Sequence, residues 1–185
     1  MGSEMQNIND WLLTTIREDE KKGVMSGWIE EKRFLILPQM AQTIAHILQG
    51  GSVIILTDNM RKWFGEYIIH HINQPHKGRP FFPIIQITHL QDMISSNTQE
   101  NTKSPKFIYN MLDMISSNYQ FWYIGKKSIG SNFAKEHGRG WYLIFDENEI
   151  LKSTDEYLDY KLLILFKVFE RALLAAMFNQ ISLDI

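Results

Sequence analysis

Few residues in this chain have the types and spacing that chemistry requires. Of its six histidines, the adjacent pair His70-His71 is the most suggestive. Neighbouring side chains diverge on a helix, whereas a helical metal pair needs a spacing of three or four residues. Glu66 stands four residues before His70, where an ordinary surface pair is expected. The sequence therefore predicts no metal site.

Nucleophilic and nucleotide chemistry also lack their usual signatures. The chain has no cysteine, which excludes a thiol nucleophile or a thiolate metal site. No Gly-x-Ser-x-Gly turn follows a strand. Gly50-Gly51 precedes a strand instead of following it, so helix termination explains it better than a nucleotide fingerprint. From these missing signatures we predict no catalytic residue and no cofactor.

The most informative stretch is residues 52–57, a short apolar run that reads Ser-Val-Ile-Ile-Leu-Thr and is followed by a helical pattern. Such a run is typical of a buried parallel strand, and ligands of open α/β sheets bind at the carboxyl ends of these strands. A phosphate-binding turn there needs glycines, but residues 57–60 have none and carry Asp58. Asp58 and Asn59 could line a ligand crevice or cap the next helix, and capping is favoured.

Helices and apolar strands alternate along the chain. Asn9 or Asp10 is expected to cap a first helix, and residues 91–103 are expected to form a polar surface loop. Further helices are predicted over residues 28–34, from Pro38 to 49, over 59–72, from Pro105 to 115, and over 129–137 and 156–179; strands are predicted over 52–57, 82–87, 121–124 and 141–145.

This alternation predicts an α/β fold, a three-layer sandwich with a mainly parallel sheet of four or five strands and helix-rich ends. With 185 residues, a single domain over 1–185 is expected. The net charge of -2 gives no electrostatic reason for binding nucleic acid. No apolar run reaches the ~18 residues of a membrane span, and the lack of cysteine is consistent with a cytoplasmic protein.

The last helix suggests an oligomer. Ser153 and Glu156 have the spacing of a capping box at its start. One apolar stripe includes Leu158, Leu162 and Phe169, and a second comprises Leu163, Ile164, Val168, Ala172 and Ala175. One sheet cannot cover both stripes, so a second subunit is favoured over a central helix in a monomer.

One group of side chains is typical of protein recognition. Arg61, Trp63 and Tyr67 share the helix predicted over 59–72. Arginine and aromatic side chains dominate binding hot spots, so the group could contact a partner. Packing across a subunit boundary is an equal alternative.

Several long motifs resemble the HobA family of initiator-associated proteins. They cover residues 41–52, 121–126, 158–163 and 165–173, the pair Arg79-Pro80, Trp11, residues 28–30, and the pattern Asp58-x-x-Arg61-x-Trp63-Phe64-x-x-Tyr67-Ile68. Residues 91–104 and 128–140 match poorly. The resemblance covers most of the chain.

The resemblance implies a fold similar to DiaA and to sugar isomerase (SIS) domains, assembled as a homotetramer. It implies a non-enzymatic adaptor that binds the amino-terminal domain of the replication initiator DnaA and promotes its assembly at the chromosomal origin. Relatives carry a leucine pair late in the terminal helix that is linked to initiator contact, matched here by Leu173 and Leu174. The alternative roles are tetramer core for this pair, and a phosphosugar-binding or isomerase SIS protein for the whole chain.

Overall fold

The computed structural model describes residues 5–74, 78, 80–99, 105–147 and 149–184. The chain divides into two compact units, one of residues 1–48 and 154–185 and one of residues 49–153. The first is called the helical unit and the second the sheet unit. That the two units form one domain over residues 1–185 stays a prediction.

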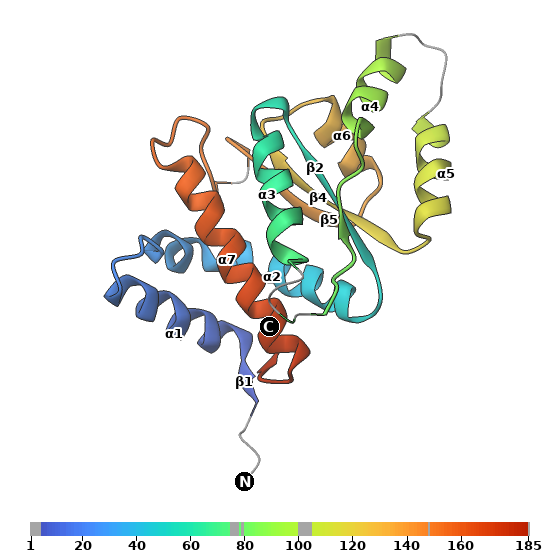
Figure 1. Cartoon of the computed structure of the whole chain (residues 1–185). Coiled ribbons are helices and arrows are strands. Elements are labelled where there is room, and N and C mark those ends of the chain that lie inside the picture. The colour runs from blue at the N-terminus through green and yellow to red at the C-terminus, as the bar shows by residue number, and fades with distance from the viewer. Residues whose placement is uncertain (1–4, 75–77, 79, 100–104, 148, 185) are drawn as a thin grey trace. The chain divides into compact units, whose positions relative to one another are not determined.

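The sheet unit is built on four parallel strands in the order β3-β2-β4-β5 (Figure 1). The strands are β2 (Ser52–Thr57), β3 (Ile84–Ile85), β4 (Tyr119–Gly125) and β5 (Gly140–Ile144). Every residue of β4 is buried, which is the reason that this strand is apolar or aromatic along most of its length.

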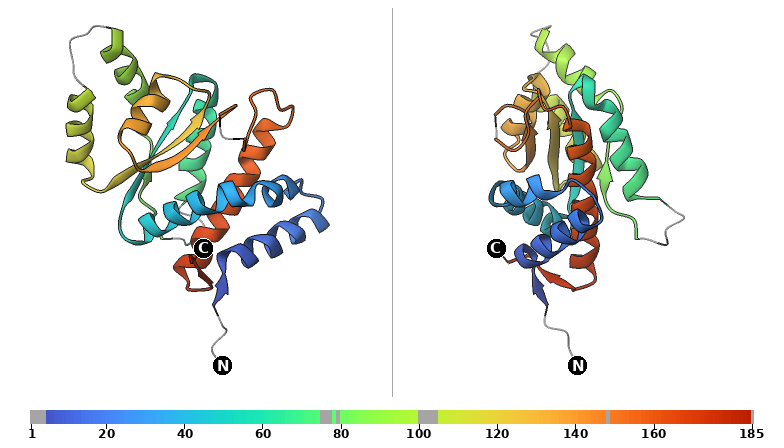
Figure 2. Two further views of the ribbon diagram at one scale, coloured as in Figure 1. Left: turned by 180° about the vertical axis from the view of Figure 1, so that it is seen from behind. Right: turned by 90° about the vertical axis from the view of Figure 1, so that its left-hand side faces the viewer.

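Helices cover both faces of this sheet. On one face, Gly65 of α3 (Lys62–Ile72) lies so close to Ile55 and Thr57 that a Cβ at this glycine would be 3.3 Å from a methyl carbon of each. On the other face, Ile54 joins a buried cluster with Phe133 of α6 (Ile129–Glu136). The cluster also includes residues of α4 (Leu90–Gln99) and α5 (Pro105–Ile115). Figure 2 shows α3 and α6 on opposite sides of the sheet. The predicted three-layer α/β fold is confirmed.

The helical unit contains α1 (Ile8–Lys21), α2 (Gly27–Leu48) and α7 (Leu158–Met177). Two short strands, β1 (Gln6–Asn7) and β6 (Ile181–Ser182), pair in parallel beside them. α1 packs against both α2 and α7. Among the described residues, no helix is both long and apolar enough to cross a membrane.

Two predictions about the first helices are wrong. The side chain of Asn7, and not of Asn9 or Asp10, caps α1 by accepting a hydrogen bond from the backbone N–H of Asn9 at 2.8 Å. α2 runs without a break through Pro38, where two shorter helices were expected. A proline removes one helical hydrogen bond, but Ile36 and Leu37 before it and Met40 and Ala41 after it are buried, and this packing holds the helix together.

The middle of the chain also departs from its local pattern. The polar stretch expected as a loop forms α4 up to Gln99, while residues 100–103 lie outside the described residues. Leu90 and Ile94, one helical turn apart, are both buried in the sheet unit and supply the apolar side of that helix. The second strand is shorter than predicted, with β3 limited to two residues.

The capping box expected at Ser153 does not form. α7 begins at Leu158, and the backbone N–H of Ser153 donates to Asp146 Oδ1 at 2.8 Å instead. A capping box is found at the start of α6, where Ser128 and Ser131 each bond the backbone N–H of the other. The expected capping box at Ser153 and the observed one at Ser128 therefore differ because Asp146 competes for the backbone N–H of Ser153.

Candidate functional site

The carboxyl ends of β2 and β4 form the switch point of the sheet. The chain leaves β2 toward β3 on one side and returns to β4 on the other. Ligands of open α/β sheets bind in the crevice at such a point. Here Asp58, which directly follows β2, is buried between these strand ends and fills the position where a ligand would enter.

Asp58 is held by the strand next to it. Its Oδ2 accepts a hydrogen bond from the backbone N–H of Lys126 at 2.7 Å. Gly125 has φ = +149°, and a Cβ there would lie 2.6 Å from the carboxylate. The side chain makes no capping hydrogen bond to the following helix, so the favoured capping interpretation is wrong. The Lys126 N–H, which lies next to the turn at residues 57–60, thus bonds the protein's own carboxylate. This disfavours the binding of an external anion at that turn.

The loop after β4 is closed by a tyrosine. The hydroxyl of Tyr123 donates to the carbonyl oxygen of Lys126 at 2.5 Å and lies 2.8 Å from Ser128 Oγ. Burial raises the pKa of Tyr123 to about 12, although the hydrogen bond with Ser128 opposes the shift. At neutral pH the residue is therefore a neutral structural donor and not a general base.

An open cavity of about 370 Å³ lies beside the edge of the sheet, between α3 and the β3–α4 connection. Its charged lining has both signs, from Lys62, Glu66 and Asp92. His89 is mostly exposed and pairs with Asp92 at 3.1 Å. In the part of the chain that the structure describes, no group of three or more His, Cys, Asp or Glu side chains is placed to hold a metal ion.

The predicted group Arg61, Trp63 and Tyr67 lies at the start of α3. The Arg61 guanidinium carbon is 5.4 Å from the ring centroid of Phe145. Trp63 is 38% exposed and packs edge-on against Phe64, whose ring in turn stacks on Tyr67. The group thus combines a buried aromatic ring, that of Phe64, with an exposed indole, and its contact with a partner stays a prediction.

The leucine pair of α7 is divided between core and surface. Leu173 is fully buried, whereas Leu174 is partly exposed. In this structure only Leu174 presents surface to a partner, and partner contact for the pair stays a prediction. The pair belongs to the helical unit, while Arg61, Trp63 and Tyr67 belong to the sheet unit.

One further surface was missed by the sequence reasoning. Trp28, Tyr157 and Tyr160 line a cavity of about 370 Å³ in the helical unit. Tyr157 and Tyr160 are close in sequence, but Trp28 is far from both, so no local motif could indicate that it shares a pocket with them. The only signal in the sequence was Trp28 itself, a large apolar side chain that is expected to pack against other residues.

Fold and site together define a class of protein: a three-layer α/β protein with a parallel sheet, whose switch point is filled by its own carboxylate and whose aromatic groups reach the surface.

Comparison with known proteins narrows this class. The profile of the family described as "HobA: DNA replication regulator" matches residues 5–183. The curated DNA replication regulator protein HobA of Helicobacter pylori is 32% identical over 187 residues, covering 97% of this chain and all of that protein. This chain therefore belongs to the HobA family of DNA replication regulators.

Solved structures agree with this assignment. The crystal structure of a HobA–DnaA (domain I-II) complex from H. pylori includes a chain with 30% sequence identity and a TM-score of 0.69, covering 96% of this chain and 99% of that chain. A crystal structure of H. pylori HobA matches with 28% identity, a TM-score of 0.64 and the same coverage.

Proposed function

We propose that this protein is a non-enzymatic adaptor that binds the amino-terminal domain of DnaA and promotes assembly of the initiator at the chromosomal origin. The observation that carries the proposal is the likeness, over nearly the whole chain, to a HobA chain solved in complex with DnaA domain I-II. The protein would act in the cytoplasm, where the initiator meets the chromosome.

A role without catalysis is supported by the switch point. Asp58 fills the place where a ligand of such a sheet would bind, and its carboxylate already bonds the backbone donor of Lys126. A phosphosugar would have to displace a buried, hydrogen-bonded carboxylate and would be repelled by its charge. The SIS-type sugar-binding alternative is thereby disfavoured.

Two surfaces are candidates for initiator contact. Trp63, with Arg61 and Tyr67 beside it, offers an exposed aromatic side chain on a packed base. Leu174 offers a partly exposed apolar side chain on α7. Each is of the kind that forms hot spots when the partner excludes water around it.

Assembly into a homotetramer would give the adaptor its effect. The second stripe of α7 gives little support, because Val168, Ala172 and Ala175 are buried within the chain itself. Support comes instead from α5, where Phe107, Met114 and Ile115 are 55%, 89% and 53% exposed. Exposed apolar groups on one helix are typical of a subunit interface. Several equivalent sites on one particle would raise the local concentration of bound initiator without tight single-site binding.

Size-exclusion chromatography with light scattering tests this function. The protein alone should elute with the mass of four chains, and addition of the amino-terminal domain of DnaA from the same genome should increase that mass. Trp63→Ala should reduce the increase while leaving the mass of the free protein unchanged. A mixture in which both proteins elute separately would overturn the proposal.

A thermal-shift measurement addresses the rival function. Sugar phosphates at millimolar concentration should leave the melting temperature unchanged, because a ligand that binds the folded state must raise it. A clear rise would show that the crevice accepts a ligand despite Asp58.

A further inference from the structure

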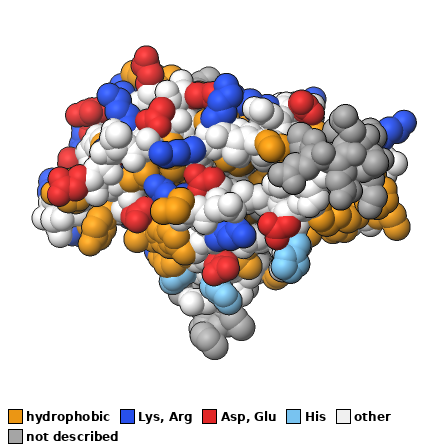
Figure 3. Space-filling view, turned by 90° about the horizontal axis from the view of Figure 1, so that it is seen from above, with side chains coloured by type: hydrophobic (Ala, Val, Ile, Leu, Met, Phe, Trp, Pro, Cys, Tyr) orange, Lys and Arg blue, Asp and Glu red, His pale blue; other side chains and the backbone are white. Residues whose placement is uncertain are grey.

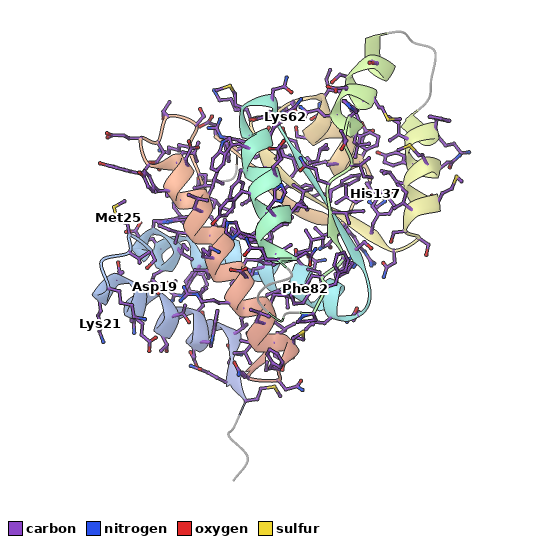
Figure 4. All side chains as sticks on the ribbon, viewed as in Figure 1. Asp19, Lys21, Met25, Lys62, Phe82 and His137 are labelled. Carbon is purple, nitrogen blue, oxygen red and sulfur yellow. The ribbon has the colours of Figure 1, made fainter. Side chains whose placement is uncertain are left out.

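The aromatic pocket of the helical unit is lined by Trp28, Tyr157 and Tyr160. It includes neither Trp63 nor Leu174, the side chains proposed above to contact the initiator. It lies between the α1–α2 connection, which contains Met25, and the first turns of α7 (Figure 4). Tyr157 and Tyr160 are 47% and 63% exposed, so their rings are open to solvent. A pocket of about 370 Å³ with aromatic walls accepts one large side chain of a partner.

The pocket already attracts a cation. The Nζ of Lys161 lies 5.7 Å from the centroid of the Trp28 ring, within the range of a cation–π contact. The Lys161 ammonium is also paired with the carboxylate of Asp155, so its charge is largely balanced. The Trp28 ring therefore already has a cation at its face, and the exposed rings of Tyr157 and Tyr160 are the ones open to a further one.

Two carboxylates complete the lining. Glu20, near the end of α1, and Glu31, in the second turn of α2, are exposed residues that line the pocket. Within the described residues, no lysine, arginine or histidine nitrogen is within ion-pair distance of either carboxylate, although the Arg17 guanidinium attracts Glu20 at longer range. Acidic and basic side chains are intermixed on the face shown in Figure 3, whereas the pocket lining holds two carboxylates and one ammonium, that of Lys161.

Glu20 lies close to the start of α2. Its carboxylate lies directly against Gly27, the first residue of α2, where any Cβ would collide with it. The amino-terminal end of a helix carries partial positive charge, which attracts a nearby carboxylate.

One donor in the pocket lacks an acceptor. Trp28 Nε1 is buried, and among the described residues no group accepts its hydrogen bond. A buried N–H without a partner is unfavourable, but this one is closed off from solvent, so it offers no contact to a docking protein in the observed conformation.

We propose that this pocket receives a basic side chain, best satisfied by arginine, from the amino-terminal domain of DnaA. The inference rests on the proposed function and adds the chemistry of recognition. The planar guanidinium stacks on the exposed ring of Tyr160 and pairs with Glu20 and Glu31, while the aliphatic stem covers Met25.

Isothermal titration calorimetry with the purified amino-terminal domain of DnaA tests the pocket. The double variant Glu20→Gln, Glu31→Gln should weaken binding about tenfold in low salt and flatten the salt dependence, because attraction between charges is screened by ions. Tyr160→Leu should weaken binding by a similar factor. The matched controls are Glu18→Gln, an exposed carboxylate of α1 outside the pocket, and Phe34→Leu, an exposed aromatic of α2 outside it; both should bind as wild type.

A charge exchange identifies the partner residue. Glu31→Lys should abolish binding, and one arginine-to-glutamate variant of the DnaA domain should restore it. If wild type binds but the pocket variants bind equally well, with no restoring partner variant, the pocket proposal is overturned and the adaptor function stands. If the wild-type protein does not bind the domain at all, both fall.

Discussion

Arg171 of α7 holds the carboxylate of Asp19, 152 residues earlier on α1, through both of its terminal nitrogens. Nη1 lies 3.1 Å from Oδ1, and Asp19 is buried while Arg171 remains partly exposed. A bidentate pair of this kind has a fixed geometry that a single point charge lacks. It ties the first and last helices of the helical unit together.

Loss of this pair should destabilise the protein. Arg171→Met leaves the Asp19 carboxylate buried without its partner, and the free energy of unfolding should fall by about 2 kcal/mol after allowance for partial exposure. Urea denaturation followed by circular dichroism measures the change. Arg17→Met is the control, because the Arg17–Glu30 pair is solvent-exposed and its loss should have little effect. Equal effects of both variants would refute this role of Arg171.

Asp58 and Gly125 should be energetically coupled. Asp58→Ala removes the hydrogen bond to Lys126 and should cost about 2 kcal/mol, in the range for a bond to a charged group. Gly125→Ala should also destabilise, because alanine disfavours φ = +149° and its Cβ would press on the Asp58 carboxylate. The double variant should cost less than the sum of the single variants, since part of the clash is gone. If the changes in the free energy of unfolding, measured by urea denaturation, were strictly additive, this coupling would be contradicted.

His137 should make stability depend on pH. Its ring stacks on Tyr119 at 4.4 Å and meets the edge of Phe121 at 5.3 Å, and burial lowers its pKa, with Asp113 acting in the opposite direction. A folded-state pKa below the unfolded value of 6.5 means that the unfolded chain takes up the proton first. This contribution to stability is present above pH 6.5 and is lost as the pH falls through the unfolded pKa.

The pH effect can be isolated by substitution. Urea midpoints for wild type should decrease between pH 7 and pH 5.5, and His137→Phe should decrease less over the same interval. The apolar ring occupies the same aromatic site but takes up no proton. A variant with the same pH dependence as wild type would exclude His137 as the source.

Single substitutions of Leu173 and Leu174 should have different effects, one on stability and the other on binding. Leu173→Ala empties a fully buried site and should cost about 3 kcal/mol of stability, as for other buried leucines. Leu174→Ala should leave the melting temperature nearly unchanged and weaken binding of the DnaA domain. Differential scanning calorimetry and isothermal titration calorimetry on each variant measure the two effects. Weakened binding by Leu173→Ala alone, without loss of stability, would reverse the assignment.

In the sheet unit, β2, β4 and β5 were predictable from the sequence, whereas β3 is shorter than predicted. β2 was predicted with its observed bounds, and β4 and β5 differ from prediction by only one to two residues at either end. They are buried on both faces, so almost every residue had to be apolar, and continuous apolar runs are easy to recognise. The parallel arrangement followed from the alternation with helices.

Helix ends and the polar helix were harder to predict. α2 continues through Pro38 and α4 forms from a polar stretch, because buried side chains outweigh weak local preferences. The capping box at Ser153 is lost to Asp146, a competitor that local spacing does not reveal.

The sequence by itself determined the α/β class, the absence of cysteine chemistry and the family resemblance, since each depends on residue types and short-range pattern. Only the tertiary structure decided that Asp58 closes the switch point, that Leu173 is core, and that Trp28 meets Tyr157 and Tyr160. The physical reason is that these contacts join segments far apart in the chain, and the packing of the elements selects them among many local alternatives.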